Sequence, residues 1–79
     1  MKDKTFILST LEGLITVMDM RRIVHIFVSR GESYDTVFTD SIYRFFVNDE
    51  LYSKYKDYKV IGLTVTLGVV GILIDERKI

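Results

Sequence analysis

Apolar positions alternate with a period of two in two parts of the chain, and each part predicts a β-hairpin. Residues 22–39 contain the run RIVHIFVS, the turn sequence RGES and the returning run YDTVFT. Residues 58–75 repeat this pattern, with a turn at Leu67-Gly68 between YKVIGLTVT and VVGILID. The β-branched residues favour strands, which should be about seven residues long in the second hairpin.

A helical period precedes the first hairpin, over residues 9–19. The sequence STLEGLITVMD begins with Ser9 and has Glu12 three residues later, which is the spacing of a capping box. The apolar residues that follow share one helical face: Leu11, Leu14, Ile15 and Met18. Gly13 costs a helix about 1 kcal/mol relative to alanine. A strand with a turn at Glu12-Gly13 is therefore the alternative interpretation.

A second helical region, residues 39–57, separates the two hairpins. Its sequence TDSIYRFFVNDELYSKYKD predicts two short helices. Asp40 or Ser41 is placed to cap the first helix, and Asn48 or Asp49 the second. The order α-β-β-α-β-β predicts an α+β fold, a four-stranded and mostly antiparallel sheet with helices packed on one face. At 79 residues, the chain (1–79) is expected to form a single compact domain.

The two faces of this sheet differ in what they predict. We assign one row of the second hairpin to the core beneath the helices: Ile61, Leu63, Val65, Val70, Ile72 and Ile74. The outer face then carries two opposite rows: Ile23, His25, Phe27, Tyr34, Thr36 and Phe38 from the first hairpin, and Tyr58, Val60, Gly62, Thr64, Val69, Gly71 and Leu73 from the second. An open face of an antiparallel sheet is normally polar, whereas large apolar patches mark interaction sites. The outer face is therefore predicted to contact another chain.

Internal cover is the alternative for the outer face, either by the N-terminal segment TFIL or by helices on both sides of the sheet. The uncharged stretch VIGLTVTLGVVGILI, residues 60–74, is too short for a transmembrane helix, which needs about 20 apolar residues. The N-terminal sequence MKDKTFILST predicts no signal peptide. We therefore expect a cytoplasmic protein that neither spans nor binds a membrane.

The amino-acid composition excludes several classes of ligand. Eleven basic and eleven acidic residues give a formal net charge of zero, which argues against duplex nucleic acid as a ligand. The absence of cysteine excludes disulfides and thiolate zinc sites, and a single histidine argues against any metal site. So small a domain buries only about 60% of its unfolded surface. Association with itself or with another protein is the remaining way to supplement its core.

The sequence predicts no group of side chains that is arranged for catalysis. His25 is the one side chain that titrates near neutral pH without a large shift, and a simple hairpin register places it opposite Phe38. The same register pairs Ser29 with Tyr34 and Phe27 with Thr36, so no nucleophile or carboxylate is expected beside His25. The sequence LGVVG lacks the spacing and the lysine of a phosphate-binding loop. No enzyme activity, cofactor or metal is predicted.

The middle third of the chain offers a second candidate surface. Residues 31–57 contain three basic and six acidic residues, and tyrosines and phenylalanines are frequent there. Solvated caps and core packing explain most of these residues, although aromatic side chains also form interface hot spots. The predicted partner-binding residues of the two surfaces together are Ile23, Phe27, Tyr34, Phe38, Tyr58, Val60, Val69 and Leu73 on the sheet, and Asp49, Glu50, Tyr52 and Tyr55 in the middle third.

Three functions fit these observations. The first is a small non-enzymatic module that binds and occludes a protein partner. The second is a self-assembling structural or accessory protein, a homodimer or a higher homo-oligomer, and the third is a binder of a small ligand or nucleic acid between subunits. The layout of STLEGLITVMD, YDTVFTDSIYRFFVNDELYSKYKDYKVIGL and VVGILI resembles that of small phage accessory proteins, some of which inhibit bacterial immune systems such as CRISPR effectors. This resemblance is one of layout over nearly the whole chain, and it assigns no functional residue.

Overall fold

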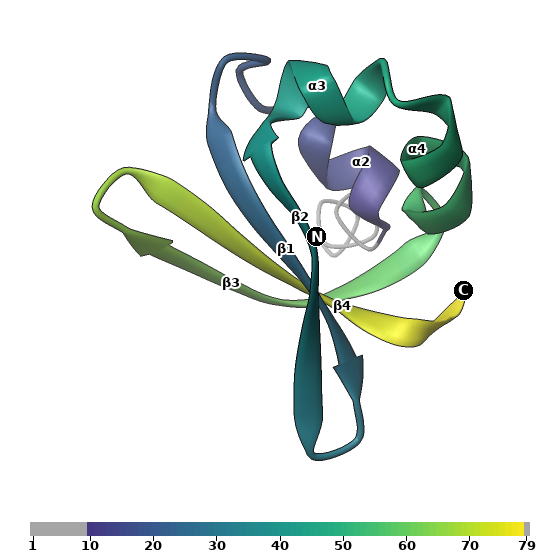
Figure 1. The fold of residues 1–79 in the computed structure, drawn as a ribbon. Coiled ribbons are helices and arrows are strands. Elements are labelled where there is room, and N and C mark those ends of the chain that lie inside the picture. The colour runs from purple at the N-terminus through teal and green to yellow at the C-terminus, as the bar shows by residue number, and fades with distance from the viewer. Residues whose placement is uncertain (1–9, 79) are drawn as a thin grey trace, which may run out of the picture.

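The computed structural model describes the backbone of residues 10–78 and the side chains of residues 10–75. The elements follow in the order α2 (Leu11–Ile15), β1 (Ile23–Arg30), β2 (Ser33–Ser41), α3 (Ile42–Phe46), α4 (Asp49–Tyr55), β3 (Tyr58–Thr66) and β4 (Val69–Lys78). The strands form one sheet in the order β2-β1-β4-β3 (Figure 1). The predicted α+β fold with a mostly antiparallel sheet is confirmed, and its two hairpins meet through a parallel pair, β1 with β4.

Each hairpin has a two-residue turn with its own backbone chemistry. Gly31, between β1 and β2, has a φ of 77°, which places glycine where a side chain would be strained. Between β3 and β4 both turn residues have positive φ, 53° at Leu67 and 83° at Gly68, the signature of a type I′ turn. The second turn therefore holds a leucine in a conformation that favours glycine or asparagine.

The first helix begins one residue later than its sequence predicts. The Thr10 hydroxyl accepts the Gly13 N–H at 3.0 Å, so Thr10 is the N-cap of α2. The predicted capping box of Ser9 with Glu12 is therefore wrong, because Glu12 lies one position too early to close it. Ser9 itself lies outside the described residues. The helix ends at Ile15, where the β-branched Thr16 and Val17 follow, so it is far shorter than residues 9–19.

The other two helices begin at predicted caps. The Ser41 hydroxyl accepts the Arg44 N–H at 3.4 Å at the start of α3. The Asn48 side chain accepts the Leu51 N–H at 3.1 Å at the start of α4. Both helices are short, and packing of their apolar residues on the sheet stabilises them more than helix propensity does.

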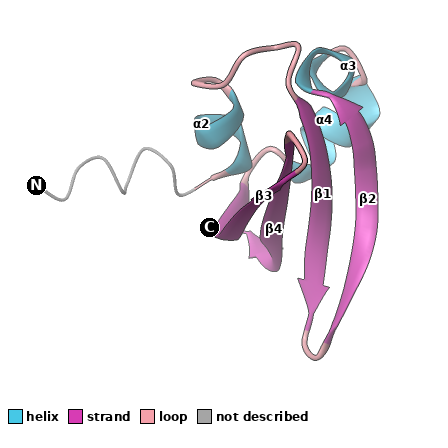
Figure 2. Ribbon diagram, turned by 90° about the vertical axis from the view of Figure 1, so that its left-hand side faces the viewer, coloured by secondary structure: helices cyan, strands magenta, loops and turns pink. Residues whose placement is uncertain are grey.

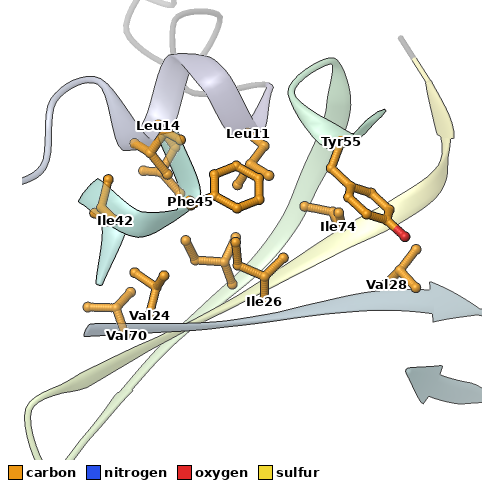
Figure 3. Close-up of a cluster of buried hydrophobic side chains, with 12 residues drawn as sticks. Leu11, Leu14, Val24, Ile26, Val28, Ile42, Phe45, Tyr55, Val70 and Ile74 are labelled. Atoms are coloured by element: carbon orange, nitrogen blue, oxygen red, sulfur yellow. The ribbon is translucent and has the colours of Figure 1, made fainter. Parts of the chain in front are cut away.

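The core lies between the helices and one face of the sheet (Figure 3). The central strands contribute every second residue, such as Val24 and Ile26 from β1 and Ile72 from β4, all of them fully buried. Phe45 of α3 lies over this layer and is 1% exposed. The buried residues form one cluster: Leu11, Leu14, Ile15, Val24, Ile26, Val28, Ile42, Phe45, Tyr55, Val70, Ile72 and Ile74. The predicted packing of the helices on one face is confirmed.

A β-bulge in the first hairpin reverses the predicted orientation of Phe38. The register shifts between Ile26 and Phe27, so that Ile26 pairs with Phe38 while Phe27 pairs with Thr36. Directly opposed residues of a sheet share a face, so Phe38 lies on the helix side with Ile26. Its ring meets that of Phe45 edge-on, with the centroids 5.3 Å apart. The placement of Phe38 on the outer face, and its pairing with His25, are therefore wrong.

Irregular pairing at the start of β3 likewise reverses the orientation of Tyr58 and Val60. Register shifts lie between Tyr58 and Val60 and between Val60 and Gly62. Val60 pairs with the buried Ile74 and packs against the core, as does Tyr58. The prediction that these two residues lie on the outer face is wrong, because an extra residue at a bulge inverts the alternation on one side of it.

The assignment of Ile61, Leu63 and Val65 to the core is also wrong. Their exposed fractions are 45%, 52% and 70%. Leu63 and Val65 pair with core residues of β4 and so lie on the helix side of the sheet. They stay exposed because the end of the β3–β4 hairpin extends away from the helices (Figure 1). Ile61 is the extra residue of the bulge between Val60 and Gly62.

Candidate interaction surface

The outer face of the sheet is assembled by the side chains that point away from the helices. Phe27 of β1 pairs with Thr36 of β2 on one side and with Leu73 of β4 on the other. Ser29 pairs with Tyr34, so the predicted register is confirmed for this half of the hairpin. The helices lie on the opposite side of the sheet and leave this face uncovered by the elements of the described chain (Figure 2).

A hollow of about 320 Å³ lies on this face, across β1, β2, β3 and β4. Three predicted contact residues line it, namely Phe27, Tyr34 and Leu73. The complete lining is Phe27, Tyr34, Gly62, Leu63, Thr64, Gly71 and Leu73. None of these side chains is charged, and only the hydroxyls of Thr64 and Tyr34 offer polar atoms from side chains. The hollow therefore suits an apolar group.

Two glycines make the hollow by leaving the middle of their strands without side chains. A Cβ atom at Gly71 would lie 2.6 Å from Thr64 Oγ1, so no larger residue fits there without displacing the threonine. A Cβ atom at Gly62 would lie 3.5 Å from Leu73 Cβ, which is an ordinary contact. Glycine within a strand often marks a place where another group approaches the backbone closely.

His25 stacks on Phe27 beside this hollow. The two ring centroids are 4.1 Å apart, and His25 Nε2 lies 3.3 Å from Thr36 Oγ1. A stacked imidazole with a hydroxyl neighbour extends the aromatic surface of Phe27. Ile23 and Val69, also predicted as contact residues, are 40% exposed and half-buried respectively, and neither lines the hollow.

The contact residues predicted in the second helical region, Asp49, Glu50, Tyr52 and Tyr55, do not join this surface. Asp49 and Glu50 are exposed in the first turn of α4, where negative charge is favoured by the helix dipole. Tyr55 is 6% exposed and its ring packs edge-on against Tyr58, with centroids 5.0 Å apart. Tyr55 is therefore a core residue, and Asp49 and Glu50 belong to the helix side of the molecule.

Tyr52 joins two helices by a partly buried polar contact. Its hydroxyl donates to Glu12 Oε2 at 2.6 Å, so α4 is tied to α2. Burial first, and the Glu12 carboxylate second, raise the pKa of Tyr52 to about 12. Glu12 thus binds the Tyr52 hydroxyl, while Thr10 caps the helix. Its backbone N–H also donates to the Lys56 carbonyl at 2.9 Å.

Within residues 10–75, no three His, Asp or Glu side chains gather in a group that could hold a metal ion. The hydroxyl of Thr36 is the polar neighbour found for His25. In the same part of the chain, no helix is long and apolar enough to cross a membrane.

Sequence reasoning missed the apolar side chain that is most exposed among residues 10–75. Leu67 is 98% exposed at the tip of the β3–β4 hairpin. The turn at Leu67-Gly68 was predicted, and a two-residue hairpin turn normally carries asparagine or glycine at its first position. A leucine there was therefore a signal available in the sequence.

Comparison with known proteins identifies no relative. No protein-family model matches the sequence, and neither a curated protein nor a solved structure matches the chain.

Proposed function

We propose that this chain is a small non-catalytic protein-binding module that receives an apolar side chain of a larger partner in the outer-face hollow. The observation that carries this proposal is the uncharged hollow lined by Phe27, Tyr34 and Leu73 over Gly62 and Gly71. Aromatic residues around a pocket are typical of interface hot spots. Binding would act by occluding the surface of the partner.

A protein fits this surface better than a small polar ligand. Sites for small molecules combine an apolar lining with several convergent polar groups that fix orientation. Here the lining offers the hydroxyls of Tyr34 and Thr64, and the stacked pair of His25 and Phe27 extends the surface beyond the hollow. The sequence layout resembles that of small phage accessory proteins, and this resemblance favours a bacterial defence protein as the class of partner.

A matched pair of tyrosine substitutions tests the proposal. Tyr34 is 64% exposed at the hollow, whereas Tyr43 is 58% exposed on α3, on the other side of the sheet. We expect Tyr34→Glu to weaken partner binding at least tenfold, because it places a charge at the rim of an apolar contact. Tyr43→Glu should bind as the unmodified chain does.

The measurement is affinity capture from a lysate of the source organism or its host, with mass spectrometry, followed by titration of the captured protein. Circular dichroism establishes that both variants are folded. A captured protein that binds equally to both variants would contradict the hollow as the contact surface. Recovery of no specific protein would turn the interpretation toward self-assembly, for which β3 supplies a separate observation.

A further inference from the structure

Among residues 10–78, β3 is an edge strand whose outer side is unpaired over most of its length. It pairs with β4 on one side, without any register shift from Gly62 to Thr66. On its other side, the pairing found among residues 10–78 is a single antiparallel bridge from Thr10 to Lys59. The regular stretch Gly62–Thr66 therefore presents backbone N–H and C=O groups to a further strand.

This edge lacks the devices that normally prevent strands from pairing between molecules. Such devices are charged residues, prolines and bulges. No charged residue lies between Val60 and Val69 in the sequence, and the bulge of β3 lies before the regular stretch. Large apolar side chains stand exposed along it instead: Ile61 at 45%, Leu63 at 52%, Val65 at 70% and Leu67 at 98%.

We propose that β3 pairs antiparallel with β3 of a second copy of the chain, centred on Thr64, to form one continuous eight-stranded sheet. Two-fold symmetry and the sheet itself determine this register. Residues that lie opposite each other in a sheet point to the same face. A residue of one β3 must therefore lie opposite a residue of the other β3 whose number differs by an even amount, because side chains alternate between the faces. The two-fold axis then passes between the two copies of a single residue. Thr64 is the middle of the regular stretch Gly62–Thr66.

The sequence around Thr64 is complementary to itself in this register. Leu63 lies opposite Val65 of the second copy, on the side of the sheet where neither is covered by a helix. Ile61 lies beside the second copy's Leu67, so all four exposed apolar side chains gain apolar neighbours. Centring on Leu63 instead would bring Leu67 to Lys59, whose edge is already taken by Thr10. The self-pairing thus accounts for the exposed leucine at the tip.

The pairing also places the two hollows on the same side of the combined sheet. It does not depend on the function proposed above, because it uses the backbone edge of β3, whereas Tyr34, the hollow residue tested above, lies on β2 at the far edge. Leu63 and Thr64 of β3 also line the hollow. A five-residue strand pair is smaller than the roughly 1,200 Å² buried in typical stable interfaces. The dimer is therefore weak and depends on concentration.

Sedimentation velocity at protein concentrations from about 5 to 500 μM tests whether the β3 edge pairs with a second copy. This range suits an interface smaller than the standard size. The unmodified chain should shift toward twice the chain mass. Val65→Lys should stay monomeric, because a lysine guards the edge. Val17→Lys is the matched control, since Val17 is 66% exposed outside the sheet, and it should associate as the unmodified chain does. A chain that stays monomeric throughout would mean that the edge is covered within the molecule and would overturn the proposal, as would equal association of both variants.

A cysteine trap tests the register, because the chain contains no cysteine. In the proposed pairing Thr64 lies opposite its own copy, within the span of about 7 Å between Cα atoms that a disulfide bridges. Thr66 and its copy lie about 13 Å apart along the strands. Under mild oxidation, Thr64→Cys should form a disulfide-linked dimer at least tenfold faster than Thr66→Cys. Equal rates, or a faster Thr66→Cys, would overturn this register. Partner binding is tested separately, on a chain that keeps Thr64, because Thr64 also lines the hollow.

Discussion

The two edge strands of the sheet, β2 and β3, have equal lengths and opposite properties. Each has nine residues and pairs antiparallel with a central strand. β2 carries Asp35 and Asp40, and its bulge falls in the middle of the strand. β3 has no charge from Val60 to its end, and its regular half carries exposed leucine and valine. One edge is built against pairing and the other is not.

The helix layer adds a second difference. On the helix side of β2, Phe38 packs against Phe45 of α3. On the same side of β3, Leu63 is 52% exposed because the helices do not extend over this end of the sheet. An apolar residue of one face thus belongs to the core or to the surface according to whether a helix covers it. Alternation along the strand does not contain this information.

The largest difference between the two edge strands is expected when Phe38 of β2 and Leu63 of β3, which lie on the same side of the sheet, are each replaced by alanine. Phe38→Ala should reduce the free energy of unfolding by about 2–3 kcal/mol, somewhat less than a fully buried phenylalanine. Leu63→Ala should change it by less than about 0.5 kcal/mol, because exposed sites contribute little. Urea unfolding at low micromolar concentration measures both. Equal losses would mean that α3 does not distinguish the two edges.

The next largest effect on stability is expected from the hydrogen bond between Tyr52 of α4 and Glu12 of α2. Tyr52→Phe removes the hydrogen bond to Glu12 and should cost about 1–1.5 kcal/mol at neutral pH. Loosening α2 also frees the Thr10 bridge at Lys59, so it lengthens the open edge of β3. Tyr43→Phe, at an exposed tyrosine, is the control and should leave the stability unchanged.

The same contact makes a prediction for alkaline pH. The pKa of Tyr52 is about 12 in the folded chain, compared with the usual value near 10. Between these two values the unfolded chain loses the phenolic proton first, so the Tyr52 contribution to stability is complete below pH 10 and is lost toward pH 12. The difference in unfolding free energy between the unmodified chain and Tyr52→Phe should therefore shrink over this window. A difference that is constant with pH would contradict the contact.

The smallest effect concerns the two turns. Leu67→Asn should stabilise the β3–β4 hairpin by about 1 kcal/mol, because leucine is strained at its φ of 53° and Asn-Gly favours a type I′ turn. Glu32→Asn in the β1–β2 turn should have little effect, since glycine already occupies the position with positive φ there. Thermal unfolding of dilute samples compares the two variants. Destabilisation by Leu67→Asn would show that the leucine supports the folded monomer.

Sequence reasoning reached the fold because the signals for it are local. Period-two runs on either side of short turns predicted both hairpins, and Ser41 and Asn48 were among the predicted caps. Most of the outer face was also predicted, including Phe27, Tyr34 and Leu73, because no bulge interrupts the alternation at these positions. The hollow itself was not predicted, since it depends on which strands lie side by side.

The wrong predictions concern residues whose face or burial depends on the strand register or on whether a helix lies over them. Phe38 and Val60 lie beyond bulges, and one extra residue turns every following side chain to the other face. Leu63 and Val65 face the helix side as predicted, but the short helices do not extend to them. A bulge is a compromise between two paired strands, so neither strand encodes it alone.

The amino-acid sequence by itself determined the strands, the turns, the caps of α3 and α4 and the uncharged character of β3, because propensity and spacing act between near neighbours. Tertiary structure alone decided the parallel pairing of β1 with β4, the bulges that turn Phe38 and Val60 to the helix side, and which strands lie at the edges of the sheet. These features arise from contacts between residues distant in the sequence. Their energy depends on how a whole helix layer fits a twisted sheet.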